Sequence, residues 1–405
     1  MDIRPILTTL RRHKTAAALI VLQVALSCAI ICNAVFLISN RIERMDRPSG
    51  MADSELVVVR YVGIGQNDDA QAQAARDLAA IRQIPGVKAA VLTNQVPFDN
   101  SSWNSSITMS KDQRDPTTEA TVYLGDEHFL DAFGVKLIQG RNFNADELID
   151  WEALQAPGSE VEIPATIISR DLAEKLFPGE HAVGKSFYSW GDEPMRIVGV
   201  VDTLIRPNDQ GGAEAAYQSM IFPVRLATGR TVVRTDPERR EEVRQAVVAE
   251  MEKLNPRRVL MAEETFDEII ADYYRADRSM VWLLVAVCIA LLVVTAFGIV
   301  GLASFWVQQR TKQIGVRRAL GATRGQVLRY FQTENFLLAT LGIVIGMALA
   351  YGINLALMER YELARLPAIY LPVGAVALWL LGQIAVLGPA RRAAAVPPAV
   401  ATRSV

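Results

Sequence analysis

The sequence predicts an α-helical membrane protein with four transmembrane helices and a large extracytoplasmic mixed α/β domain of two lobes, inserted between helices 1 and 2. Three observations predict it: four long charge-free runs, a Lys/Arg asymmetry between the flanking segments, and an acidic insertion with strand and helix patterns. The 405 residues are 51% hydrophobic and 21% charged, which excludes a disordered chain. Three cysteines exclude a disulfide scaffold, and a net charge of −2 excludes a generally basic nucleic-acid-binding protein.

Each charge-free run exceeds the ~20 residues that cross a bilayer. The runs cover residues 15–40, 279–309, 335–358 and 366–390. Buried core helices are the alternative, but they rarely run this long without a charge. A basic start before the first run also fits a cleaved signal peptide, or a lipoprotein site at Cys28. Because the apolar run continues to Ile38, we expect an uncleaved anchor instead.

The distribution of Lys and Arg sets the orientation. Residues 1–14 carry four Lys/Arg and residues 308–331 carry six, whereas residues 40–279 hold 27 basic and 40 acidic groups. We therefore expect a bacterial inner-membrane protein with both termini cytoplasmic and residues 41–278 extracytoplasmic. The predicted segments are 1–14 (cytoplasmic), 15–40 (helix 1), 41–262 (external domain), 263–278 (stalk), 279–307 (helix 2), 308–332 (cytoplasmic loop), 333–358 (helix 3), 359–365 (external loop), 366–388 (helix 4) and 389–405 (cytoplasmic tail).

Polar and small residues within the spans predict contacts between helices. Gln23, Ser27 and Asn33 are interpreted as interhelical hydrogen-bonding groups, and Gly342 with Gly346 forms a G-x-x-x-G pattern that lets helices approach closely. Incidental glycines remain the alternative for the second pattern. The three cysteines all fall within spans and are expected to be apolar filler, so the external domain has no disulfide. Almost no ionisable group lies within the spans, which argues against an ion-driven carrier.

The insertion shows strand–helix–strand patterning in two blocks. Strands are expected at 56–62, 87–93, 121–124, 134–138, 165–169, 186–190, 195–201, 221–224 and 231–234, and helices at 68–84, 127–133, 171–177 and 237–254. Residues 94–118, rich in Asn, Ser and Asp, are predicted to be a long exposed loop. The first and last parts of the insertion are expected to complete one lobe together.

Residues 263–278 predict a rigid helical stalk that continues into the second span. Its apolar positions share one helical stripe: Phe266, Ile269, Ile270, Tyr273 and Tyr274. An amphipathic helix packed on its own domain is the alternative.

Residues 179–186 match the phosphate-loop pattern G-x-x-x-x-G-K-S letter for letter. A phosphate loop needs a strand before it and a helix after it, so that backbone N–H groups meet the phosphates. Here the predicted order is inverted, and the loop lies outside the cell, so we reject nucleotide binding at Gly179–Ser186. No His, Cys or carboxylate constellation indicates a catalytic or metal site, and we expect neither in this chain.

The cytoplasmic loop carries the strongest functional signal. Its spacing predicts a short helix, a break at Gly321, and a third span that begins with a Thr323–Gln326 capping box. Apolar residues among six cations could dock in a groove of a partner protein. A basic loop that binds anionic lipid headgroups is the alternative.

Residues 309–322 of this loop resemble the signature of FtsX/MacB-type ABC transporter permeases. The segments 140–143, 176–179 with 184–185, and 198–201 are similar to the MacB-like periplasmic core domain, and 389–394 resembles the family's C-terminal end. The resemblance covers nearly the whole chain in order. It implies a coupling loop that a cytoplasmic ATPase grips. The implied contact residues are Arg310, Gln313, Ile314, Gly315, Arg317, Arg318, Ala319, Leu320, Gly321, Ala322 and Thr323.

The resemblance also implies partners. ATP and Mg would be bound by a dimer of separate ATPase subunits, since this sequence shows no ATPase domain, and a second permease subunit would complete a homodimer or a related heterodimer. Gln313 stands where the family usually has Glu, which removes one charge from that contact. A periplasmic adaptor or an outer-membrane channel is a further partner that the resemblance allows.

The implied function is mechanotransmission that extrudes a peptide, lipopeptide, lipoprotein or drug. ATP-driven closure of the ATPases would move the loop, tilt spans 1 and 2, and shift the external lobes through the stalk. One alternative is a mechanotransmitter that regulates a cell-wall hydrolase or senses a peptide. Another, of a different class, is a membrane-anchored ligand receptor.

Overall fold

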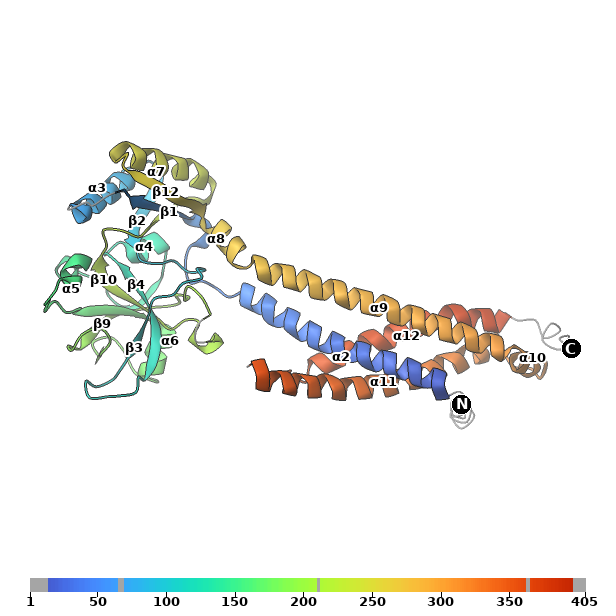
Figure 1. The fold of residues 1–405 in the computed structure, drawn as a ribbon. Coiled ribbons are helices and arrows are strands. Elements are labelled where there is room, and N and C mark those ends of the chain that lie inside the picture. The colour runs from blue at the N-terminus through green and yellow to red at the C-terminus, as the bar shows by residue number, and fades with distance from the viewer. Residues whose placement is uncertain (1–13, 65–68, 210–211, 362–364, 396–405) are drawn as a thin grey trace. The chain divides into compact units, whose positions relative to one another are not determined.

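The structure, a computed structural model, describes residues 14–64, 69–209, 212–361 and 365–395. The chain divides into two compact units, one made of residues 1–46 and 276–405 and the other of residues 47–275 (Figure 1). The predicted N-terminal cytoplasmic segment up to residue 13, positions 362–364 of the short external loop, and the tail beyond residue 395 lie outside the described residues.

The first unit, called here the membrane unit, contains four helices that are long and apolar enough to cross a membrane. Their bounds are α2 (Lys14–Met45), α9 (Arg275–Gln309), α11 (Arg324–Tyr361) and α12 (Tyr370–Ala395). A short helix, α10 (Thr311–Ala319), lies between α9 and α11. In its most apolar stretch α2 is 56% buried and α9 only 17%. The central helix is therefore α2, while α9 presents a wide apolar face.

The predicted interhelical groups make their contacts in the membrane unit. Gln23 Nε2 donates to the Val294 carbonyl (3.0 Å), and the Ser27 and Thr295 hydroxyls lie 2.8 Å apart. These two bonds tie α2 to α9, and Asn33 ties α2 to α11 through the Ala350 carbonyl at 3.2 Å.

The G-x-x-x-G glycines of α11 lie against α2. A Cβ at Gly346 would be 2.6 Å from the Ala25 carbonyl oxygen, and one at Gly342 would be 2.9 Å from that of Val21. Both obstacles are backbone atoms that cannot move aside, so the predicted close helix approach is confirmed.

An ion-pair cluster joins the ends of α2 and α9 where the chain passes to and from the insertion. Asp277 is 5% exposed and pairs with both Arg41 and Arg44, at 3.1 Å from the latter. A carboxylate this buried needs such partners, because an unpaired charge away from water is costly. The cluster therefore fixes the two helix ends to each other.

The second unit, residues 47–275, is the insertion, and its first lobe is a four-stranded antiparallel sheet in the order β12-β1-β11-β2. The strands are β1 (Leu56–Gly63), β2 (Val87–Thr93), β11 (Arg230–Thr235) and β12 (Arg258–Thr265). Helices α3 (Ala70–Arg82) and α7 (Arg240–Leu254) pack on this sheet through an apolar cluster that includes Val57, Ile81 and Val247 (Figure 1). As predicted, the two ends of the insertion complete this lobe together.

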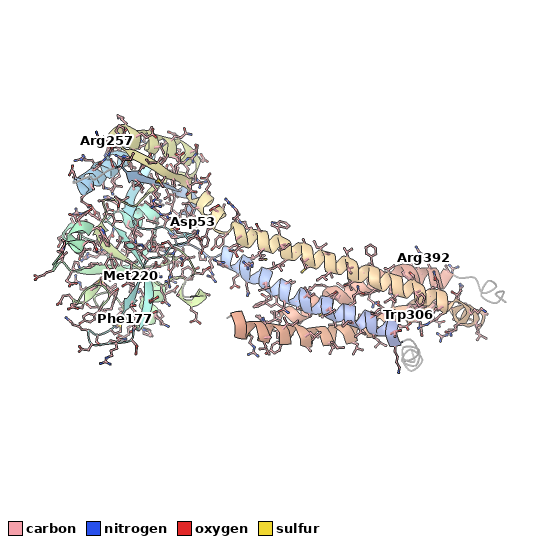
Figure 2. The ribbon with its side chains drawn as sticks, viewed as in Figure 1. Asp53, Phe177, Met220, Arg257, Trp306 and Arg392 are labelled. Carbon is pink, nitrogen blue, oxygen red and sulfur yellow. The ribbon has the colours of Figure 1, made fainter. Side chains whose placement is uncertain are left out.

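The second lobe is a mixed sheet in the order β3-β4-β10-β7-β9-β5, with β6 on β10 and β8 on β9. The strands are β3 (Asn104–Ile107), β4 (Thr118–Gly125), β5 (Leu137–Gly140), β6 (Ile149–Asp150), β7 (Ala165–Ser169), β8 (Ser186–Phe187), β9 (Met195–Val201) and β10 (Ser219–Arg225). The other helices of the insertion are α4 (Phe129–Phe133), α5 (Trp151–Gln155), α6 (Arg170–Leu176) and α8 (Phe266–Tyr273), of which α8 packs on β12 and β1 of the first lobe. Its 3-10 turns are η1 (Asp53–Glu55), η2 (Ala145–Glu147), η3 (Ala213–Ala215) and η4 (Pro237–Arg239). Met220, labelled in Figure 2, is fully buried in the core of this sheet.

Two predictions for the insertion were wrong in detail, and one strand was missed. Residues 94–118 are not simply an exposed loop, because β3 pairs with β4 and Gln95 is buried beneath it. The strand expected at 134–138 begins later, at Leu137, because Gly134 adopts φ +69° and ends α4. The segment 258–265, for which no strand was predicted, forms β12 at the sheet edge.

Candidate functional site

The candidate site is the segment between α9 and α11. Arg310 precedes α10, and Leu320 ends it before Gly321, whose φ of +98° turns the chain toward α11. The predicted capping box is present: the Thr323 N–H donates to Gln326 Oε1 (2.9 Å), and the Gln326 N–H donates to Thr323 Oγ1 (3.3 Å). The segment is thus a short helix held between two defined turns.

One face of α10 is anchored to the membrane unit. Ile314 is 6% exposed and packs with Val327 and Phe331 of α11 and with Ala390 and Ala393 of α12. Gly315, on the same face, is also buried. This packing fixes which side of the helix faces away from the bundle.

Arg310 belongs to the same anchor. Its Nη1 donates to both carboxylate oxygens of Glu334 at 3.0 and 2.8 Å, and the two side chains are 7% and 1% exposed. The guanidinium also lies 5.4 Å from the ring centroid of Trp306, which is labelled near the end of α9 in Figure 2. Arg310 is therefore part of the support of α10 rather than of its free surface.

The opposite face of α10 is exposed. Val316 is 50% exposed and Leu320 is 83% exposed, four residues apart on one side of the helix. The other exposed members of the segment are Lys312, Gln313, Arg317, Ala319, Gly321 and Thr323. This exposed face, with two apolar residues among cations, is called the docking face below.

The structure therefore divides the residues expected to contact an ATPase. The exposed residues are Gln313, Arg317, Ala319, Leu320, Gly321 and Thr323, whereas Arg310, Ile314 and Gly315 are buried against the bundle. Arg318 and Ala322 are half-buried, and Arg318 Nη1 donates to the Ala394 carbonyl at 3.0 Å.

Sequence reasoning missed the supporting residues Glu334 and Trp306. A signal was present: Arg310 directly follows one charge-free run and Glu334 directly precedes the next. Opposite charges at the facing ends of consecutive membrane helices are well placed to pair, because the helices lie side by side.

The predicted stalk is not one continuous helix. Helix α8 starts after β12 with a capping box between Thr265 and Glu268 and ends at Tyr273, and α9 begins at Arg275, so the helix is interrupted at Tyr274. Residues 263–265 belong to β12, so the stalk range begins within a strand.

The apolar stripe of α8 packs on its own lobe. Phe266 and Ile269 are buried, Ile270 is half-buried, and Tyr273 and Tyr274 lie against Phe98 with ring centroids 5.7 Å apart in each pair. Phe98 also contacts Phe266 and has a φ of +63°, which is rare for a side chain of this size. The aromatic packing holds this backbone conformation.

The phosphate-loop match lies in an inverted setting. Helix α6 precedes Gly179 and strand β8 follows, as the sequence patterns predict. The Gly184 N–H donates to the Ile197 carbonyl (2.8 Å) and the Lys185 N–H to that of Ala182 (3.1 Å), so these two donors are not aimed at a common ligand. Lys185 pairs with Glu180 and lies 4.5 Å from the Phe177 ring centroid. Across the ranges that the structure describes, no three His, Cys, Asp or Glu side chains group as metal ligands.

Comparison with known proteins identifies both units. A family model for the MacB-like periplasmic core domain matches residues 17–250, and one for the FtsX-like permease C-terminal region matches residues 285–398. The chain is 27% identical over 286 residues to the macrolide export ATP-binding/permease protein MacB of Chromobacterium violaceum, covering 67% of this chain and 41% of that protein.

A second relative matches from end to end. The uncharacterized ABC transporter permease YknZ of Bacillus subtilis is 23% identical over 424 residues, covering 99% of this chain and 98% of that protein. The solved extracellular domain of a YknZ transporter from Gram-positive bacteria aligns with 51% of this chain and 100% of its own length, at 15% identity and a TM-score of 0.32. The chain thus spans about two fifths of the MacB relative and nearly all of the Bacillus permease.

The four apolar helices and the inserted α/β domain are those of a membrane protein with an extracytoplasmic domain. The two family models together cover most of the sequence in the order in which the two units occur. The chain belongs to the FtsX/MacB-type family of ABC transporter permeases.

Proposed function

We propose that this chain is the permease subunit of an ABC transporter whose ATP hydrolysis is carried out by a separate cytoplasmic ATPase dimer. In this proposal the chain itself is not catalytic, and ATP and Mg are bound by the ATPase subunits. The observation that supports it is the docking face of α10: Leu320 and Val316 are exposed while the opposite side of the helix is anchored. A helix that presents apolar residues from a fixed support suits insertion into a partner's groove.

The charges of the docking face agree with this assignment. Lys312 and Arg317 are exposed beside Val316, so the partner groove is expected to carry acidic residues at its rim. Gln313 adds a neutral hydrogen-bonding group to the same surface. By the Lys/Arg distribution, this face lies in the cytoplasm, with both termini on the same side of the bacterial inner membrane.

The wide apolar face of α9 supports a second permease subunit beside this one. Trp282 and Phe297 are 73% and 70% exposed, and such a face is covered by lipid or by another helix. We propose a dimer, either of two copies or with a related chain. The dimer would transmit motion of α10 to the extracytoplasmic lobes and so extrude its substrate.

The test is co-expression of this chain with a candidate ABC ATPase, followed by co-purification and by ATP hydrolysis of the complex. Leu320→Asp changes only an exposed residue, so it should abolish co-purification while the chain still folds and reaches the membrane. Arg391→Gln, an exposed cation of α12, is the matched control and should leave the complex intact. Normal binding and hydrolysis in Leu320→Asp would refute the docking assignment.

Gly315→Asp distinguishes contact from support. Gly315 is buried, so a carboxylate there should loosen α10 and lower thermal stability as well as ATPase binding. Loss of binding with unchanged stability in Leu320→Asp, and loss of both in Gly315→Asp, is the pattern that the geometry predicts.

A further inference from the structure

The extracytoplasmic unit contains a cleft between its two lobes that the coupling mechanism does not use. Its volume is about 330 Å³. The lining combines both lobes: Arg60 and Val62 from β1, Trp103 before β3, Trp151 and Glu152 from α5, and the crossing segment 226–229. This set is called the tryptophan cleft below.

The aromatic side of the cleft is exposed yet fixed in place. Trp103 is 43% exposed, although its backbone N–H donates to Oε1 of the buried Gln95 at 2.8 Å. Its carbonyl accepts from the Val122 N–H at 2.8 Å and from the Thr121 hydroxyl at 3.0 Å. Three hydrogen bonds therefore fix the backbone at Trp103, so its exposed indole extends toward a ligand from a rigid support.

The second tryptophan connects this surface to the core. The rings of Trp103 and Trp151 are 5.8 Å apart, those of Trp151 and Trp190 are 6.0 Å apart, and Trp190 meets the buried Phe222 at 5.3 Å. Trp103 and Trp151 are thus held in place by ring contacts that lead into the core of the second lobe. Rigid tryptophans of this kind supply large contact area at low entropic cost.

The rim carries two opposite charges. Arg60 and Glu152 are both exposed at the cleft, and neither has an ion-pair partner among the described residues. At the bottom of the cleft, segment 226–229 packs closely on β2. A Cβ at Gly229 would lie 2.3 Å from the Thr93 carbonyl oxygen, so only glycine fits there. A ligand that bears both a cation and an anion would complement this rim.

The volume limits what can enter. Ligand pockets span about 300–1,000 Å³, and this cleft is at the small end. It is large enough for one aromatic or large aliphatic side chain, and too small for an entire macrocycle. We infer that the tryptophan cleft is a peptide-binding site that takes one aromatic side chain between Trp103 and Val62, with Arg60 and Glu152 holding an acidic and a basic residue of the peptide.

This inference rests on the proposed export function for its role as a substrate site, but binding itself is measured without the ATPase. The full chain in lipid nanodiscs is titrated with acetyl-Lys-Ala-Phe-Ala-Glu-amide, and calorimetry measures the affinity. The same peptide with Ala in place of Phe should bind about tenfold more weakly or worse. Equal affinity of the two peptides would overturn the inference.

Variants of the chain test whether the peptide binds in the tryptophan cleft. Trp103→Ala should weaken binding of the Phe peptide about tenfold or more, whereas Trp282→Ala, which removes an even more exposed tryptophan from a membrane helix, should not change it. Arg60→Glu should weaken binding of this peptide but not of its neutral counterpart with Gln at both ends. An unchanged affinity in Trp103→Ala would refute the site.

Photo-crosslinking locates the site in the wild-type chain, so its result does not depend on whether a variant folds. The peptide for this experiment carries the photoreactive residue benzoylphenylalanine in place of Phe. Irradiation followed by mass spectrometry of the wild-type chain should locate the adduct on residues of the tryptophan cleft, and an adduct confined to the membrane helices would overturn the assignment. If binding is found but the peptide does not stimulate the ATPase complex, the export function fails and the site stands. If the ATPase complex forms but no peptide binds, the site fails and the permease assignment stands.

Discussion

The buried pair of Arg310 and Glu334 gives the sharpest test of how α10 is held. In Glu334→Gln the shape of the side chain is kept but its charge is lost, and the Arg310 guanidinium stays buried against the Trp306 ring. Breaking a buried pair by removing one partner costs about 3–5 kcal/mol. The side chains are 7% and 1% exposed, so water offers little compensation and the loss should lie in this range.

The first assay is thermal unfolding of the full chain in nanodiscs, combined with a double-mutant cycle. Glu334→Gln and Arg310→Met should each destabilise the chain, and the double variant should be less destabilised than the sum, with a coupling of about 1–3 kcal/mol. Lys312→Gln removes an exposed cation from the same segment and should change stability by less than about 0.5 kcal/mol.

The second assay follows α10 directly by limited trypsin digestion after Arg317. Loosening of the anchor should raise the cleavage rate at least about tenfold, since cleavage follows the population of the opened segment. Additive losses in the cycle, together with an unchanged cleavage rate in Glu334→Gln, would refute the reasoning.

Three further predictions concern other parts of the chain. Gly346→Leu should cost about 1–3 kcal/mol of thermal stability by forcing α11 from α2, whereas Gly352→Ala, with nothing within 4 Å, should be neutral or stabilising. Asp277→Asn should loosen the contact between the ends of α2 and α9, because it removes the charge that pairs with Arg41 and Arg44. Disulfide formation between one cysteine introduced at each of these helix ends should then be slower, and an unchanged rate would contradict the role of this ion-pair cluster. The bidentate guanidinium of Arg141 lowers the pKa of Glu147 below its ordinary 4.5, so this carboxylate stabilises the fold above that pH and the stabilisation is lost as pH falls. Arg141→Gln should therefore move acid unfolding, followed by circular dichroism, to higher pH, and an unshifted transition would exclude this contribution.

Much of the architecture follows from local sequence patterns. The four spans, the capping box at Thr323 and the strands at 87–93 and 165–169 were predictable, because charge-free runs and β-branched stretches report directly on burial. The first and last parts of the insertion were also expected to share a lobe, and the strands predicted at 56–62 and 231–234 pair there as β1 and β11.

The sequence alone did not reveal which residues distant in the chain contact each other in the fold. The apolar stripe of Phe266 and Ile269 fits a free stalk as well as a packed helix, and only the position of Phe98, more than 160 residues away, decides between them. Likewise, Arg310 within a basic signature looks like a contact residue until Glu334 is seen beneath it. β12 was missed because its exposed edge alternates weakly between apolar and charged side chains.

The order of strands in the first lobe also governs how the chain must be made. β1 pairs with β11 and β12, which are synthesised about 170–200 residues later. Since synthesis proceeds at about 5–20 residues per second, the backbone hydrogen-bonding groups of β1 stay without their partner strands for on the order of 10–40 s. Its sequence, LVVVRYVG, is a strongly aggregation-prone segment. The second lobe lies between these strands in sequence and can form first, so the first lobe is the last part of the insertion to mature and the one most dependent on protection during biogenesis.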